Sequence, residues 1–179
     1  TAAASGSAAG GRSASVSGRQ LLVDGSPIHL KGVNWNPVRK GGRNPQDLDF
    51  RGFVLEDARM MARAGINAVR TYLAIDDTEV LDILWEHRIY VLSTVYINAE
   101  VDVSVVLDHV RQVVDHPAVL MWVIGNEWNY NGFYQGLPLA DSVKLVREAA
   151  RNIRQLDPAR PIATIYGGLP SAEGVDSLR

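Results

Sequence analysis

The sequence contains no cysteine among its 179 residues, which excludes disulfides and cysteine-ligated metal sites. Its four histidines show no ligand spacing, so we expect neither a metal site nor a cofactor. The formal net charge is −2 and the basic residues are scattered, which argues against binding to nucleic acid or to an anionic membrane. No apolar run approaches the ~20 residues of a membrane-spanning helix. None of these absences distinguishes an extracellular or periplasmic protein from a cytoplasmic one.

What the sequence does contain is an ordinary globular composition, with 46% hydrophobic and 21% charged residues. The exception is the segment 1–18, which is rich in alanine, serine and glycine and is predicted to be flexible. That segment also lacks the apolar core of a signal peptide. The remaining residues, 19–179, form the predicted folded domain.

Short apolar runs alternate with segments of helical periodicity along this domain. An Asp24-Gly25 pair between two apolar runs predicts a β-hairpin at its start. Asp76 is predicted to cap the second helix, and Asp141 or Ser142 the fourth. Strands are predicted over residues 31–35, 68–73, 90–96, 119–127 and 161–166, and helices over 54–64, 80–85, 103–114 and 143–153.

Strands that alternate with helices predict a parallel α/β sheet, either open and doubly wound or closed as a (β/α)8 barrel. No Gly-x-Gly-x-x-Gly follows the first strand, which removes the best support for a dinucleotide-binding sheet. We therefore predict a (β/α)8 TIM barrel preceded by the hairpin. A complete barrel takes ~250 residues and eight strands, so this chain is expected to cover about strands one to five. The other strands would come from a longer polypeptide, a missing C-terminal half-barrel, or self-association of partial barrels.

The most informative stretch is an apolar run over 119–124 that ends in Gly125, Asn126, Glu127 and Trp128. A continuous apolar run is typical of a strand buried on both faces, and functional residues of parallel barrels lie at the carboxyl ends of strands. Glu127 is therefore the candidate catalytic acid. A carboxyl group beside amides and aromatic rings suits a carbohydrate.

Further sugar contacts are expected from residues at or after other predicted strand ends. Trp35, Trp128 and Tyr130 are predicted to offer flat apolar faces to sugar rings. Asn34 is predicted to face the same site. Tyr72, Tyr96 and Tyr166 end predicted strands, and each is expected to donate a hydrogen bond from its hydroxyl.

Several segments resemble the catalytic barrel of glycoside hydrolase family two. They are LVDGSPI at 22–28, LKGVN at 30–34, GINAVR at 65–70, HPAV at 116–119 and GNE at 125–127. Family five cellulase-type barrels and fungal-type β-glucan transglycosylases share much of this pattern. The resemblance covers residues 20–170, and the GNE segment with its surroundings is its most specific part.

This resemblance implies a role for three residues. Glu127 matches the acid/base glutamate that ends strand four in this clan, and Asn126 matches the amide that binds the 2-hydroxyl of the sugar. Arg70 matches the arginine near the nucleophile, which is a glutamate at the end of strand seven. No such glutamate is present in this chain. The resemblance thus implies a retaining β-glycoside hydrolase whose nucleophile lies outside the sequence given.

Other functions remain open on the sequence alone. The same site would serve a glycan transglycosylase, because acceptor choice depends on surrounding loops. Without a strand-seven carboxylate the chain would be a non-catalytic carbohydrate-binding barrel or an inactive partial barrel. An inverting mechanism would need its second carboxylate from Glu100.

Overall fold

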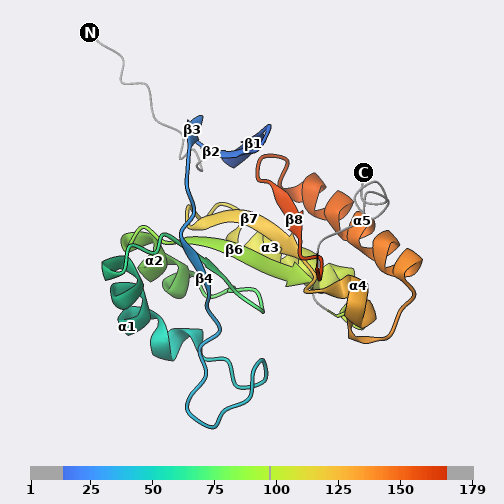
Figure 1. Cartoon of the computed structure of the whole chain (residues 1–179), viewed down its shortest axis with the longest axis horizontal. Coiled ribbons are helices and arrows are strands. Elements are labelled where there is room, and N and C mark those ends of the chain that lie inside the picture. The colour runs from blue at the N-terminus through green and yellow to red at the C-terminus, as the bar shows by residue number, and fades with distance from the viewer. Residues whose placement is uncertain (1–13, 97, 169–179) are drawn as a thin grey trace.

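A computed structural model describes residues 14–96 and 98–168 of the chain. Its centre is a parallel sheet of β4 (Gly32–Asn34), β5 (Ala68–Arg70), β6 (Tyr90–Tyr96), β7 (Val119–Ile124) and β8 (Ile162–Thr164). The strands lie in chain order, each beside the one that follows it (Figure 1). A doubly wound sheet would reverse its order at a switch point, whereas a barrel keeps it. The prediction of about five strands of a (β/α)8 barrel is therefore confirmed.

Four longer helices connect these strands and share a hydrophobic core with the sheet. They are α1 (Phe50–Arg63), α2 (Thr78–Glu86), α3 (Val103–Val113) and α5 (Leu139–Leu156). The core contains Val54 and Leu81 from the helices and Val91 and Trp122 from the strands, all at most 1% exposed. Within residues 14–96 and 98–168, no helix is long and apolar enough to cross a membrane.

A small antiparallel sheet precedes the first barrel strand. It is formed by β1 (Ala14–Ser17), β2 (Gln20–Val23) and β3 (Ser26–Pro27), and the predicted hairpin joins β2 to β3. Asp24 and Gly25 both adopt a positive φ, of 50° and 76°, as a two-residue hairpin turn requires. Ala14–Ser17 belong to the segment 1–18 that is predicted to be flexible, and they pair with β2; residues 1–13 lie outside the described part.

This small sheet covers the amino-terminal ends of the barrel strands. Ala14 and Val23 are buried in a second apolar cluster with Ala68, Tyr90 and Leu120. Those three residues lie on β5, β6 and β7, near the end of the sheet where each strand begins. The opposite, carboxyl end of the sheet is therefore the one left for a functional site.

Two helix starts differ from their prediction. Asp77, not Asp76, caps α2, because its side chain accepts a hydrogen bond from Glu79 N at 3.0 Å. Helix α5 begins at Leu139 after Pro138, so neither Asp141 nor Ser142 caps it. Asp141 instead lies in the first turn, where the helix dipole favours a negative charge.

A buried ion pair at the end of α5 is hydrogen-bonded to residues of β7. Asp157 and Arg160 are 3% and 6% exposed in their side chains and lie 3.0 Å apart. Asp157 also accepts a hydrogen bond from Trp122 Nε1 at 2.8 Å, and Arg160 Nε donates to Val119 O at 2.8 Å. Burial acts to raise the pKa of Asp157, but hydrogen bonds from Trp122 and Arg160 outweigh it and hold that pKa below its usual value.

Candidate active site

The backbone turns sharply where β7 ends, and this turn presents Glu127. Gly125 has φ +73° and Glu127 has φ +49°, both in the left-handed region. Glu127 N donates to Ile165 O at 3.0 Å, which ties the turn to the segment after β8. The carboxylate side chain is exposed. The strand is shorter than its predicted range of 119–127 because Gly125 already leaves the extended conformation.

Asn126 and Arg70 meet across the carboxyl end of the sheet, although 56 residues separate them. Arg70 Nη2 donates a hydrogen bond to Asn126 Oδ1 at 2.8 Å. Arg70 ends β5 and Asn126 follows β7, so β6 lies between the two strands that carry them. The structure thus brings together three residues predicted for the catalytic centre, since Glu127 is the chain neighbour of Asn126.

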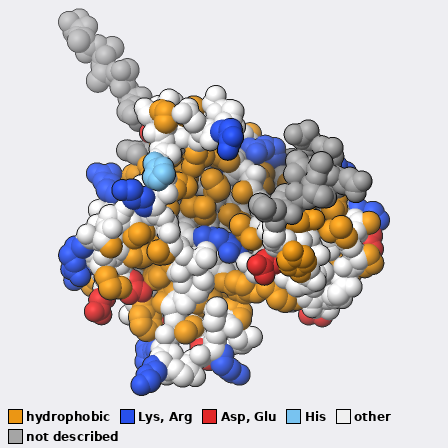
Figure 2. Space-filling model, in the orientation of Figure 1, with side chains coloured by type: hydrophobic (Ala, Val, Ile, Leu, Met, Phe, Trp, Pro, Cys, Tyr) orange, Lys and Arg blue, Asp and Glu red, His pale blue; other side chains and the backbone are white. Residues whose placement is uncertain are grey.

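The Arg70 guanidinium is half-buried and electrostatically coupled to its surroundings. Burial lowers the pKa of Arg70, while Tyr72, Tyr134 and Glu127 act in the opposite direction. Arg70 Nε is buried and has no hydrogen-bond partner within the described residues. The face of the molecule in Figure 2 shows hydrophobic side chains around a small basic patch near its middle.

Two tyrosines complete this cluster, of which the sequence analysis did not assign Tyr134 to the site. The hydroxyl groups of Tyr72 and Tyr134 are hydrogen-bonded, and Asn126 Nδ2 donates to the Tyr134 hydroxyl at 3.4 Å. Burial, together with Tyr134, raises the pKa of Tyr72 above its usual value. Tyr134 has no signal in the sequence that would place it here, because a short loop of unusual backbone conformation carries it.

The predicted sugar-binding residues divide into two groups. Asn34 is exposed at the end of β4 and pairs in register with Arg70, so it lies at the same edge. Tyr130 is 74% exposed. Its ring lies against Gly167, where an added Cβ would approach Tyr130 Cδ2 to 2.4 Å. Tyr166 is half-buried and its ring meets that of Trp128 edge-on at 5.4 Å.

Trp35 and Trp128 require a correction, because both are buried. Trp35 is 6% exposed, packs on Phe50 and donates from Nε1 to Asp57 Oδ2 at 2.8 Å. Trp128 is fully buried, and its Nε1 donates to Thr164 Oγ1 at 2.6 Å. Neither ring offers a face to a sugar. Both instead support the loops that surround the strand ends.

Gly125 is a position where the turn and the packing both exclude a side chain. An added Cβ would lie 2.6 Å from Trp128 Cδ1, and the φ of +73° is itself unfavourable for alanine. Gly25 has a similar φ of +76° but nothing within 4 Å of an added Cβ. We expect Gly25→Ala to lower the free energy of unfolding by about 1 kcal/mol, through backbone strain alone.

Gly125→Ala is expected to cost about 1–3 kcal/mol more, because it also displaces the buried Trp128. Chemical denaturation of the two variants measures this difference. Equal losses would show that Trp128 is not clamped against the turn.

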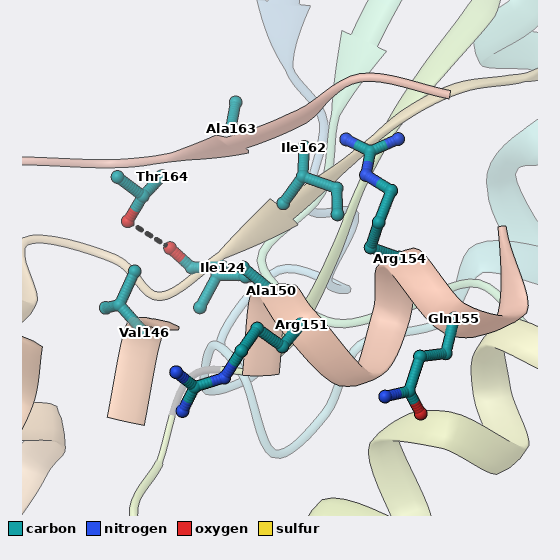
Figure 3. Close-up of a pocket in the computed structure, with 9 residues that line it drawn as sticks. All are labelled: Ile124, Val146, Ala150, Arg151, Arg154, Gln155, Ile162, Ala163 and Thr164. Carbon is teal, nitrogen blue, oxygen red and sulfur yellow. Dashed lines mark hydrogen bonds between the residues drawn. The ribbon is translucent and has the colours of Figure 1, made fainter. Parts of the chain in front are cut away.

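A cavity of about 200 Å³ is lined by Asn34 and Arg70 of this site. Over the ranges 14–96 and 98–168, no three His, Asp or Glu side chains are grouped in a way that would hold a metal ion. A cavity of about 590 Å³ lies elsewhere, between β8 and α5 (Figure 3). Its walls include Ile124, Val146, Ile162 and Arg154, and none of the site residues described above.

Comparison with known proteins supports a common origin with glycosidase barrels. Residues 96–176 match the model of the family described as "Glycosyl hydrolases family 2, TIM barrel domain". The chain is 26% identical over 172 residues to the β-glucuronidase of Sus scrofa and 24% identical over 176 residues to that of Homo sapiens. Each match covers 86% of this chain and 24% of the relative, so the chain spans about a quarter of the relatives' length.

Solved structures show the same fold. A glycosyl hydrolase family 2 member from Bacteroides cellulosilyticus superimposes with a TM-score of 0.71 and 20% identity, over 93% of this chain and 22% of that one. The β-glucuronidase of Parabacteroides merdae gives a TM-score of 0.65 and 21% identity, over 86% of this chain and 20% of that one.

The parallel sheet in chain order defines part of a (β/α) barrel, with a carboxylate and an amide where β7 ends. Together with the family match over residues 96–176, these features support a catalytic barrel of the glycoside hydrolase family 2 type. Residues 14–96 and 98–168 form five strands of such a barrel.

Proposed function

We propose that this chain contributes the acid/base half of a retaining β-glycoside hydrolase. The observation that carries the proposal is the meeting of Arg70, Asn126 and Glu127 at the carboxyl ends of β5 and β7. A titratable carboxylate on a strained turn, exposed to solvent, stands beside an amide whose orientation a guanidinium holds. Such an arrangement suits proton transfer to and from a bound sugar.

In the proposed reaction two carboxyl groups act on the anomeric carbon, ~5–5.5 Å apart. Glu127 first donates its proton to the oxygen of the leaving group, while a second glutamate attacks the anomeric carbon and forms a covalent glycosyl-enzyme. Glu127, now ionised, then takes a proton from water, which attacks the same carbon and releases the sugar. Asn126 holds the 2-hydroxyl through its amide. The second glutamate is supplied from outside this chain.

The unsatisfied donor on Arg70 supports a carboxylate partner at this place. Arg70 Nη2 is occupied by Asn126, whereas the buried Nε has no partner within the described residues. Buried donors are nearly always hydrogen-bonded, and a guanidinium pairs well with a carboxylate. A glutamate at the end of a seventh strand would satisfy Nε, and the positive charge would keep that glutamate ionised and nucleophilic.

The remaining barrel strands are proposed to complete the fold beside β8. Strand β8 pairs with β7 along one edge, and Ile162 and Thr164 point from it toward α5 beside the cavity of about 590 Å³ (Figure 3). An exposed edge of a parallel sheet is prone to pair with another strand. A C-terminal half-barrel, rather than a second copy of this chain, would cover this edge and supply the nucleophile.

A β-D-glucuronide is the first substrate to test, because the curated relatives are β-glucuronidases. In a polypeptide that also supplies the nucleophile, we expect the first sugar released to have the β configuration, because two inversions restore it. Proton NMR of the anomeric signal during early turnover measures this. Initial release of the α anomer would reject the retaining mechanism and would direct attention to Glu100 as a second carboxylate.

A further inference from the structure

The short loop after β7 holds a tyrosine hydroxyl beside Asn126. Gly132, Phe133 and Tyr134 all adopt a left-handed conformation, with φ of 55°, 54° and 61°. Such a conformation is costly for Phe and Tyr, so the surrounding packing must maintain it. Phe133 is fully buried and its ring stacks on Trp128 with centroids 6.0 Å apart.

Asn131 forms one hydrogen bond to a residue that follows β7 and one to Tyr134 in the loop. Its Nδ2 donates to Asn126 O at 2.6 Å, and its Oδ1 accepts from Tyr134 N at 3.4 Å. The hydrogen bonds of Asn131 and the packing of Phe133 together set the placement of Tyr134. Strained residues that are held in this way concentrate at functional sites.

The donor and the acceptor in the hydrogen bond between Asn126 and Tyr134 follow from the contact of Asn126 with Arg70. A guanidinium can only donate, so the atom of Asn126 that faces Arg70 is the acceptor Oδ1. The amide nitrogen of Asn126 therefore faces Tyr134 and donates to its hydroxyl oxygen. Tyr134 accepts this bond, and its own proton is not used in it.

The hydrogen bond between the hydroxyl groups of Tyr72 and Tyr134 also leaves the Tyr134 proton available to a ligand. Tyr72 is the more buried of the two tyrosines, whereas Tyr134 is 44% exposed. The bond between the two hydroxyl groups runs from Tyr72 as donor to Tyr134 as acceptor. The Tyr134 oxygen then accepts two bonds, so neither of them uses its own proton.

We propose that Tyr134 is a substrate-binding residue whose hydroxyl donates a hydrogen bond to an oxygen of the sugar held beside Asn126. This inference rests on the proposed function, in which a sugar occupies the carboxyl ends of β5 and β7. Tyr134 would favour a sugar that carries an oxygen at the contacted position. A sugar without that oxygen cannot accept the hydrogen bond from the Tyr134 hydroxyl.

The test compares Tyr134→Phe with the unaltered chain and with Tyr90→Phe. Tyr90 lies at the opposite end of the sheet, in the cluster covered by the small antiparallel sheet. The probes are methyl β-D-glucosiduronic acid and its 2-, 3- and 4-deoxy analogues, titrated into 15N-labelled protein and followed by NMR. Tyr134→Phe is expected to weaken binding of the parent probe roughly three- to ten-fold, and Tyr90→Phe to leave it unchanged.

One deoxy analogue distinguishes a direct hydrogen bond between Tyr134 and the sugar from an indirect effect of Tyr134 on the shape of the site. The analogue that lacks the contacted oxygen is expected to bind the unaltered chain and Tyr134→Phe equally well. Equal affinity of both proteins for the parent probe, the same loss for every analogue, or no binding of any probe by the unaltered chain would each overturn the proposal. These outcomes do not depend on turnover, so they are distinct from a failure of Glu127 as acid/base.

Discussion

Replacing Glu127 with Gln is expected to lower kcat/KM for an alkyl β-glycoside by about 10²–10⁴-fold, in a polypeptide that also supplies the nucleophile. Glutamine keeps the size and the hydrogen-bonding oxygen of the side chain but has no proton to give to the leaving group. The loss should be smaller with a para-nitrophenyl glycoside, because nitrophenolate departs with little protonation. Initial rates with the two substrates measure this difference.

Glu100→Gln is the matched control for this experiment. Glu100 is an exposed glutamate in the loop after β6, at the same end of the sheet, and it is the carboxylate that an inverting mechanism would use. We expect Glu100→Gln to retain the activity of the unaltered enzyme. Undiminished turnover by Glu127→Gln would remove the acid/base assignment. A large loss of turnover in Glu100→Gln alone would instead assign the acid/base role to Glu100, in the loop after β6.

Replacing Asp157 with Ala is expected to lower the free energy of unfolding by about 3–5 kcal/mol, because it leaves the buried Arg160 guanidinium without its counter-charge. Trp122 Nε1, also buried, would lose its acceptor in the same variant. Asp141→Ala is the control, since Asp141 forms an exposed i,i+3 pair with Lys144. That variant should change stability by less than about 0.5 kcal/mol. Denaturant titration compares the two.

The contribution of Asp157 should also depend on pH. Its pKa is lower in the folded protein than in the unfolded chain, so the stabilisation is complete above the unfolded pKa of about 4 and is lost as the pH falls toward the folded value. The stability difference between the unaltered chain and Asp157→Ala should therefore shrink below about pH 4. A difference that stays constant down to pH 2 would show that the charge of Asp157 is not what stabilises the fold.

Much of the fold follows from local patterns that the sequence displays directly. Val54, Ala58 and Met61 are buried on one face of α1, as their spacing predicts, and Gly65 has the positive φ of a residue that ends a helix. The run Tyr90–Tyr96 forms β6 with the predicted bounds. The helix starts are less predictable, since Asp76 and Asp77 are equally good caps in the sequence and only Asp77 is placed to accept from Glu79 N.

Local patterns in the sequence predicted only part of the candidate site. Chain order places Glu127 and Asn126 where a buried strand ends, and the family resemblance points to Arg70. Aromatic residues near strand ends look alike in a sequence whether they face a ligand or the core. Trp35 and Trp128 proved to be buried, whereas Tyr134, without any such signal, bonds to Asn126.

The sequence by itself determined the alternation of strands and helices, and the residues at the end of each strand, because periodicity and turn chemistry act between near neighbours. Only the tertiary structure decided which of those residues meet. Arg70 bonds to Asn126 across 56 residues, and Tyr72 to Tyr134 across 62, because parallel strands in chain order bring their carboxyl ends to one edge. The left-handed loop that holds Tyr134 is stabilised by the packing of Phe133 on Trp128, and a local pattern does not encode such a contact.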